Sequence, residues 1–158
     1  AGGQVMRKVL LISALIAGLS GCATNSHYGN YSAAPAAYDK TMASDTVAHL
    51  VTMYPPALTC LNILQPTEDA YGTALLALLR GRGYSVNEYA PGAAKKAQPA
   101  TQAAFTPGVD LRYVVDSLAP AADLYRVTVV VGNQPISRAY MPQKNGTVAA
   151  AGSWSRKE

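Results

Sequence analysis

Cys22 is the residue whose surroundings most clearly predict chemistry. It follows Leu19, Ser20 and Gly21, a stretch whose small residues let a signal peptidase reach the backbone. The thiol can then carry diacylglycerol, and the amine freed by cleavage can carry a further acyl chain. Because each buried CH₂ contributes about 0.8 kcal/mol, two or three acyl chains form a lasting membrane anchor. This covalent lipid is the only prosthetic group that we expect, with no separate cofactor.

The residues before this cysteine have the organisation of a lipoprotein signal peptide. Arg7 and Lys8 form a positive start, and 11 uncharged residues follow them over Val9–Leu19. A membrane-spanning helix needs roughly 20 apolar residues, so this run is too short to span. We therefore expect residues 6–21 to be removed, with an ordinary secretory signal or an apolar core helix as the alternatives. Residues 1–5 are expected to be an untranslated or non-native extension.

No other group of residues predicts catalysis or metal binding. The two histidines are His27 and His49, and the second is expected on the solvated side of a helix. Glu68 and Asp69 are adjacent on a predicted helix and point in different directions, so they suit capping better than acid–base catalysis. The serines lack a nucleophile-elbow motif. We expect no catalytic and no metal-binding residue, with a periplasmic hydrolase kept as an alternative.

Size and charge narrow the class of protein. The chain has 158 residues and a formal net charge of +4, to which the signal peptide contributes two cations. The part from Cys22 onward is long enough for one domain and a tether. Its lysines and arginines are scattered without a basic stripe, so direct nucleic-acid binding is not expected. Cys60 lies in an apolar run and is expected to be a small buried hydrophobe, with an intermolecular disulfide as the alternative.

Residues 22–40 are expected to form a lipidated, flexible tether. They are small and polar, with Gly29 and Pro35 among them, and cannot bury enough apolar surface to fold alone. Fully extended, the tether would reach about 60 Å. Residue 23 is Ala and not the Asp that retains bacterial lipoproteins in the inner membrane, so the expected location is the periplasmic face of the outer membrane.

Three tyrosines recur along this tether and are candidates for docking into a partner's groove: Tyr28, Tyr31 and Tyr38. Solvated linker side chains are the alternative.

Apolar residues spaced by three and four predict two amphipathic helices. The first covers Thr41–Tyr54 and is stopped by two prolines. The second has Thr67 as its expected N-cap and ends near Gly83, which can adopt a left-handed conformation. The expected buried residues of the two helices are Val47, Leu50, Val51, Tyr54, Tyr71, Ala74, Leu75, Leu78 and Leu79.

Strands are predicted around and after these helices. Ala57–Leu64 is expected to be a strand buried on both faces, and Tyr84–Tyr89 a second strand, before a low-complexity loop over residues 91–107. Beyond the loop, apolar and polar residues alternate, which predicts four antiparallel strands. The expected turns lie at residues 119–123, 132–133 and 145–146.

The predicted order is therefore α-β-α-β-loop-β-β-β-β. This order defines a small α+β periplasmic domain over residues 41–158, with two helices packed on one face of a mostly antiparallel sheet. An unpaired edge of such a sheet can dock a neighbour, and Ile136–Met141 or Thr147–Trp154 are the expected edges. Ile136, Tyr140 and Trp154 are their candidate docking residues, with packing of Trp154 in the core as the alternative.

Six segments together resemble the TrbH family, the outer-membrane lipoproteins of P-type conjugative transfer systems: LSGCAT, VAHLVTMYPPA, TEDAYGTALLALLRGRGYSV, DLRYVVD, LYRVTVVVGNQPISRAYMP and AGSWSRKE. The resemblance implies a non-enzymatic subunit of a conjugative type IV secretion system. Such a subunit would sit in a ring at the outer membrane and hold the channel-forming subunits there, as part of a hetero-oligomer. Cys22 is the one functional residue that carries over.

A pilotin-like lipoprotein, or another envelope-assembly lipoprotein that binds one client transiently, is the alternative to a channel scaffold. The two differ in stoichiometry, because a scaffold stays in the assembled complex.

Overall fold

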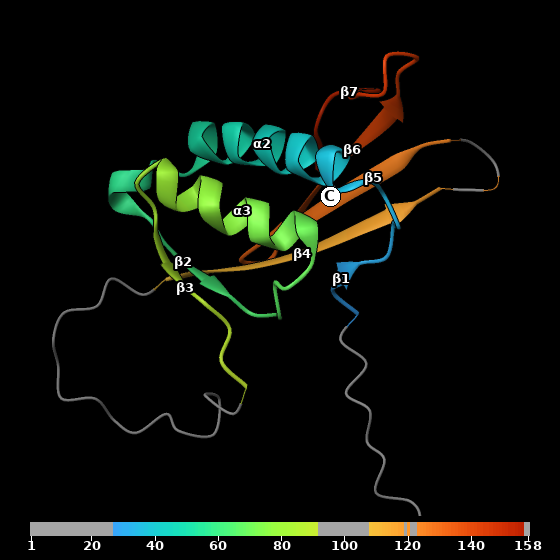
Figure 1. The fold of residues 1–158 in the computed structure, drawn as a ribbon. Coiled ribbons are helices and arrows are strands. Elements are labelled where there is room, and N and C mark those ends of the chain that lie inside the picture. The colour runs from blue at the N-terminus through green and yellow to red at the C-terminus, as the bar shows by residue number, and fades with distance from the viewer. Residues whose placement is uncertain (1–26, 92–107, 119, 121–122, 157–158) are drawn as a thin grey trace, which may run out of the picture.

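The computed structural model describes residues 27–91, 108–118, 120 and 123–156, and these form one sheet with two helices (Figure 1). The expected α+β class is confirmed. In chain order the elements are β1 (Gly29–Asn30), α2 (Ala36–Met53), a 3₁₀ helix (Pro56–Leu58), β2 (Cys60–Ile63), α3 (Ala70–Gly81), β3 (Ser85–Asn87), β4 (Val109–Ser117), β5 (Tyr125–Val131), β6 (Gln134–Pro142), β7 (Val148–Ala150) and β8 (Ser155–Arg156).

The sheet has eight strands in the order β3-β2-β4-β5-β6-β7, with β1 beside β4 and β8 beside β6. The strands from β4 onward pair antiparallel, whereas β1 and β2 run parallel to β4, and β3 runs parallel to β2. The prediction of a mostly antiparallel sheet is therefore confirmed. Figure 1 shows α2 and α3 side by side on one face of this sheet, as expected.

Two tight turns connect the antiparallel strands where the sequence predicts them. Gly132 and Gly146 both have positive φ, at 60° and 76°, which glycine adopts without a side-chain clash. Part of the third turn, between β4 and β5, lies outside the described residues. Its ends meet through a 2.9 Å hydrogen bond that the Leu118 N–H donates to the Leu124 carbonyl.

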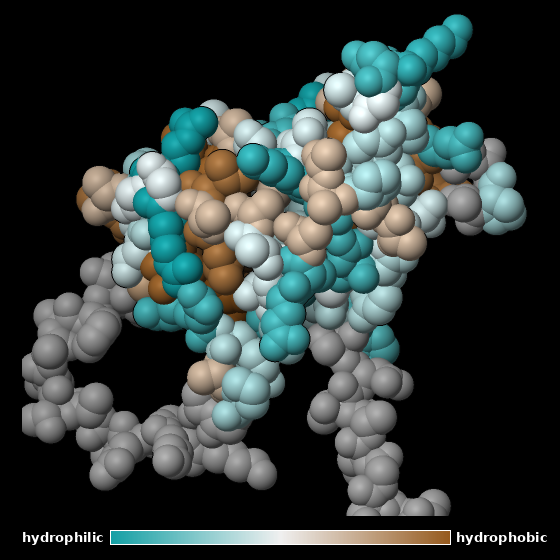
Figure 2. All heavy atoms as spheres, in the orientation of Figure 1, coloured by the Kyte–Doolittle hydropathy of each residue, from teal (hydrophilic) through white to brown (hydrophobic). Residues whose placement is uncertain are grey.

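The core lies between the helix layer and the sheet. Alternate residues of β4 and β5 point inward and are almost fully buried, as the period of two predicts. Figure 2 shows apolar residues between the two helices, bordered by hydrophilic ones. The expected helical stripes are confirmed, with Val51, Tyr54, Ala74 and Leu78 only partly buried at their margins. The largest contributors to the core are Met42, Val47, Leu50, Leu61, Ile63, Tyr71, Leu75, Leu79, Leu111, Tyr113 and Tyr140.

The structure corrects several predicted boundaries. The first helix begins at Ala36 instead of Thr41, and residues 29–30 form a strand, so the prediction of a flexible tether was wrong for residues 29–40. The predicted strand over Ala57–Leu64 forms only at Cys60–Ile63 and alternates in burial, because its second face is not covered by the helices. The predicted last strand is divided into β7 and β8. Most of the loop over residues 91–107 lies outside the described residues.

The second helix begins at Ala70, and its N-cap is Asp69 instead of the predicted Thr67. The Asp69 carboxylate accepts a 2.9 Å hydrogen bond from the Gly72 N–H and a 2.5 Å hydrogen bond from the Tyr113 hydroxyl. The prediction that Asp69 serves in helix capping is therefore confirmed. A single side chain caps α3 and ties it to the central strand β4.

We predict that Gly72→Ala destabilises the fold. A Cβ at this position would overlap the Tyr113 hydroxyl and lie 2.9 Å from the Thr67 Cα, so helix and strand would have to separate. Overpacking of this kind costs about 1–3 kcal/mol in the free energy of unfolding, measured by urea denaturation. Gly81→Ala is the matched control, because a Cβ there meets nothing within 4 Å. Equal stability of the two variants would contradict the prediction.

Candidate functional site

The residues of the predicted acylation site, Leu19, Ser20, Gly21 and Cys22, lie outside the described residues. The part of the chain that follows them is described from His27 onward. Acylation at Cys22 therefore stays a prediction. The structure does show how the segment that follows the cysteine, from His27 onward, is joined to the domain.

The strand β1 is fixed to one edge of β4. Its Gly29 and Asn30 are in register with Val114 and Val115, and the Tyr31 N–H donates a 2.7 Å hydrogen bond to the Val115 carbonyl. Backbone groups in a sheet interior need such partners, because an unpaired buried amide or carbonyl is costly. The segment after the predicted lipid site is thus part of the sheet.

The gap between β1 and β2 along this edge is filled by a side chain. Gln65 is buried, and its amide donates a 3.1 Å hydrogen bond to the Tyr113 carbonyl while its oxygen accepts a 2.7 Å hydrogen bond from the Tyr113 N–H. The amide of Gln65 therefore replaces one peptide group of a neighbouring strand. Taken in order along β4, the partners β2, Gln65 and β1 provide hydrogen bonds to the backbone groups of one edge of this strand.

A buried polar network connects β1 to the first turns of α2. The Asn30 amide donates a 3.0 Å hydrogen bond to Asp39, while its oxygen accepts hydrogen bonds from the Ser32 N–H and hydroxyl. Asp39 is only 2% exposed. Burial raises its pKa to about 6, against the lowering effect of the Asn30 hydrogen bond, and the negative charge of Asp69 raises it further.

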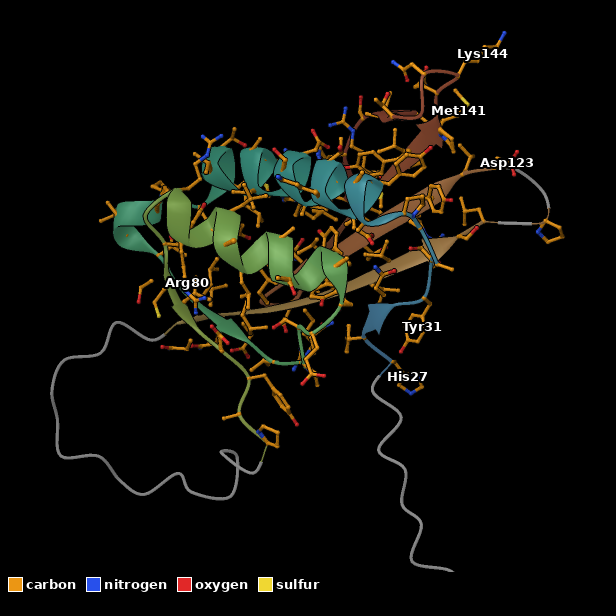
Figure 3. The ribbon with its side chains drawn as sticks, viewed as in Figure 1. His27, Tyr31, Arg80, Asp123, Met141 and Lys144 are labelled. Atoms are coloured by element: carbon orange, nitrogen blue, oxygen red, sulfur yellow. The ribbon has the colours of Figure 1, made fainter. Side chains whose placement is uncertain are left out.

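The three tether tyrosines lie in different surroundings. Tyr38 packs edge-on against Tyr125, with ring centroids 5.9 Å apart, and so belongs to the margin of the core. The Tyr28 ring lies 5.4 Å from the Arg112 guanidinium carbon. Tyr31 is 60% exposed, and Figure 3 shows it beside His27 on the side of the sheet away from the helices. Tyr28 and Tyr31 thus stay at the surface, whereas Tyr38 contributes to packing.

The predicted docking edge over Ile136–Met141 is wrong. These residues belong to β6, which pairs with β5 on one side and with β7 and β8 on the other. Ile136 and Tyr140 are 4% and 1% exposed, because their side chains point toward the helices. Within the described residues, the outermost strands on this side of the sheet are β7 and β8, so the second predicted edge, Thr147–Trp154, lies at the margin.

Trp154 packs against the helix layer, the alternative that the sequence left open. Its ring stacks on His49 with centroids 5.0 Å apart and planes 5° from parallel, and the Arg138 guanidinium carbon lies 6.0 Å from the ring. His49, which was expected on the solvated side of the helix, is therefore partly covered by this ring. Burial lowers the pKa of His49, against the opposing charge of Asp45.

An ion pair connects α2 to β6 and was missed by sequence reasoning. Arg138 donates hydrogen bonds of 3.0 and 2.8 Å to the Asp45 carboxylate, and the buried Tyr140 hydroxyl donates one of 2.6 Å to the same group. The pattern did contain a signal, because Arg138 shares one strand face with Ile136 and Tyr140. An arginine on the inward face of a strand needs a carboxylate from the opposite layer.

The described residues contain no group of three or more His, Cys, Asp or Glu side chains that could hold a metal ion. Burial raises the pKa values of Tyr71, Tyr113 and Tyr140, which are bound to Thr46, Asp69 and Asp45 in the packing between layers. Cys60 is half-buried and accepts a hydrogen bond from the Asn87 amide, so it is more exposed than expected.

These features define a small α+β module whose polar side chains hold its layers together. The chain belongs to the TrbH family of conjugal transfer proteins, because the family described as "Conjugal transfer protein TrbH" matches it over residues 24–158. No curated protein and no solved structure matches the chain significantly. None of the described helices is long and apolar enough to cross a bilayer.

We predict that Asp39→Asn changes stability in a pH-dependent way. Because folding raises the pKa of Asp39 from 3.8 to about 6, its stabilising contribution is full below pH 4 and is lost as the pH rises through 6. Relative to the wild type, the free energy of unfolding of Asp39→Asn should rise by up to about 3 kcal/mol between pH 4 and 7.5. Urea denaturation at a series of pH values measures this difference, and a constant difference would contradict it.

We predict that Asp45→Asn costs about 1–3 kcal/mol in the free energy of unfolding, because Arg138 and the buried Tyr140 hydroxyl lose a charged acceptor. Asp116→Asn is the control. Its carboxylate also pairs with an arginine, Arg126, but this pair joins neighbouring strands at the surface and should contribute less than about 1 kcal/mol. Thermal and urea unfolding measure the stability of both variants. Similar losses in the free energy of unfolding would contradict the prediction that the contact between helix and sheet contributes more than the pair between strands.

Proposed function

We propose that this chain is a lipid-anchored structural component of the outer-membrane core complex of a conjugative type IV secretion system. In that complex it holds channel subunits at the outer membrane during plasmid transfer. The observation that carries the proposal is the family match, which covers residues 24–158 and so begins two residues after Cys22. Membership of the conjugal transfer family supports a role in plasmid transfer, and the acylation motif supports attachment to a membrane.

The proposed mechanism is attachment without catalysis. Acyl chains on Cys22 hold the amino-terminal end at the membrane, and pairing of β1 with β4 joins that end directly to the sheet. A load applied by a bound partner is then carried by backbone hydrogen bonds and the Asn30–Asp39 contact. The partners are the outer membrane and other subunits of the transfer channel, in a hetero-oligomer, with no direct contact to nucleic acid.

The proposed location at the outer membrane rests on Ala23, the residue that follows the acylation site. Ala23 lacks the carboxylate that retains lipoproteins in the inner membrane, so the mature chain is carried to the periplasmic face of the outer membrane. The alternative of a periplasmic hydrolase gains no support from the described residues, because their groups with strongly displaced pKa values lie in the packing between the layers.

Replacement of Cys22 by Ser tests the proposal. The Cys22→Ser precursor should incorporate no palmitate, should leave the outer-membrane fraction and should lower the frequency of plasmid transfer. Cys60→Ser is the matched control, since it removes the other cysteine and should change none of these. Retained outer-membrane partition of Cys22→Ser would refute the anchor. Failure of the wild-type protein to co-purify with channel subunits would refute the scaffold role.

A further inference from the structure

The pairing of β1 fixes the place where the lipidated segment leaves the domain. Seven peptide steps separate Cys22 from Gly29, the first residue of β1, and seven residues span at most about 25 Å when fully extended. The expected reach of about 60 Å applied to a tether that ended at Lys40. The domain is therefore held much closer to its lipid anchor than the sequence suggested.

This short reach restricts how the domain is oriented. A domain of this length is roughly 36 Å across, from the usual scaling of the radius of gyration with chain length. The segment is shorter than the domain, so it cannot run from the membrane past the molecule to a β1 end that points away. This reach keeps β1 within about 25 Å of the bilayer and so excludes the far side of the domain, provided that Cys22 carries the lipid of the proposed function.

The surface at the β1 end has the chemistry of a membrane contact. Tyr31 is 60% exposed, and Figure 3 shows it and His27 projecting from this end, away from the helices. Beside them the Tyr28 ring lies against the Arg112 guanidinium. Tyrosine rings favour the level of the lipid headgroups, where the ring is partly apolar and the hydroxyl meets water. Arginine adds attraction to anionic phosphates.

We propose that the end of the domain carrying β1, with Tyr28, Tyr31 and Arg112, rests on the lipid surface to which Cys22 is attached. The proposal rests on the lipid anchor of the proposed function and commits to one occupant, a phospholipid headgroup layer. Two independent features point to it: the length of chain between the anchor and the sheet, and the aromatic and basic side chains where that chain emerges.

A reference position lies at the opposite end of α2. The network of Asn30 and Asp39 places β1 at the amino-terminal end of this helix, whereas Leu58 follows its carboxyl-terminal end. The 18 residues of α2 correspond to about 27 Å of helix. Leu58 is 78% exposed and apolar, so a tryptophan there is tolerated as easily as at Tyr31.

The chain contains a single tryptophan, Trp154, which allows a clean fluorescence test. In a Trp154→Phe background, Tyr31→Trp and Leu58→Trp each provide one reporter. The acylated, full-length mature proteins are reconstituted into vesicles of phosphatidylethanolamine and phosphatidylglycerol with brominated acyl chains, which quench nearby indoles. We expect several-fold more quenching for Tyr31→Trp than for Leu58→Trp, and a decrease for Tyr31→Trp when Arg112→Gln is added.

Equal quenching of the two reporters, or stronger quenching of Leu58→Trp, overturns the proposed orientation while leaving the anchor intact. Quenching of Tyr31→Trp that Arg112→Gln leaves unchanged overturns the role of the arginine. A mature protein whose Cys22 carries no lipid by mass spectrometry, and which does not bind the vesicles, instead overturns the proposed function. The two failures are therefore distinguishable.

Discussion

The need to pair the backbone of the central strand β4 determines much of this structure. One side of β4 is joined to β5 along seven consecutive residue pairs, but the other side has no single long partner. Three short pieces fill that edge: β2, the amide of Gln65 and β1. An unpaired amide or carbonyl at a buried edge is costly, so each piece is needed although each is short. Tyr113 lies at the middle of this arrangement, because its backbone binds Gln65 and its hydroxyl binds Asp69 at the start of α3.

This arrangement gives the amino-terminal segment a structural role. A strand of two residues contributes few hydrogen bonds, and the Asn30 side chain of β1 adds hydrogen bonds to Asp39 of α2 and to Ser32. In a protein attached to a membrane at the residues just before β1, the sheet and the anchor form one connected unit. That connection suits a subunit that must transmit force between a membrane and its partners, as the proposed role in the transfer channel requires.

The polar side chains inside the domain serve the same purpose of joining layers. Asp45 binds Arg138 and Tyr140, Asp69 binds Tyr113, and Thr46 and Tyr71 share a 2.8 Å hydrogen bond between their hydroxyls. Each pair links one helix to the sheet or to the other helix. Buried polar groups are favourable only when their partners are positioned well, so these pairs fix the relative placement of the elements more than they add to stability. The domain thus has a well-defined arrangement of its helices on the sheet.

The sequence alone determined the features that depend on local pattern. The period of two in β4, β5 and β6, the helical spacing in α3, and the glycines of the two tight turns placed these elements because neighbouring residues share one environment. The acylation motif and the family resemblance were equally readable. Tertiary structure decided what depends on distant partners: Asp45 and Arg138 are 93 positions apart, and β1 meets β4 across more than 80 residues. The polar segment before α2 looked like a linker because its hydrogen-bonding partners lie elsewhere in the chain, and only the folded sheet brings them to it.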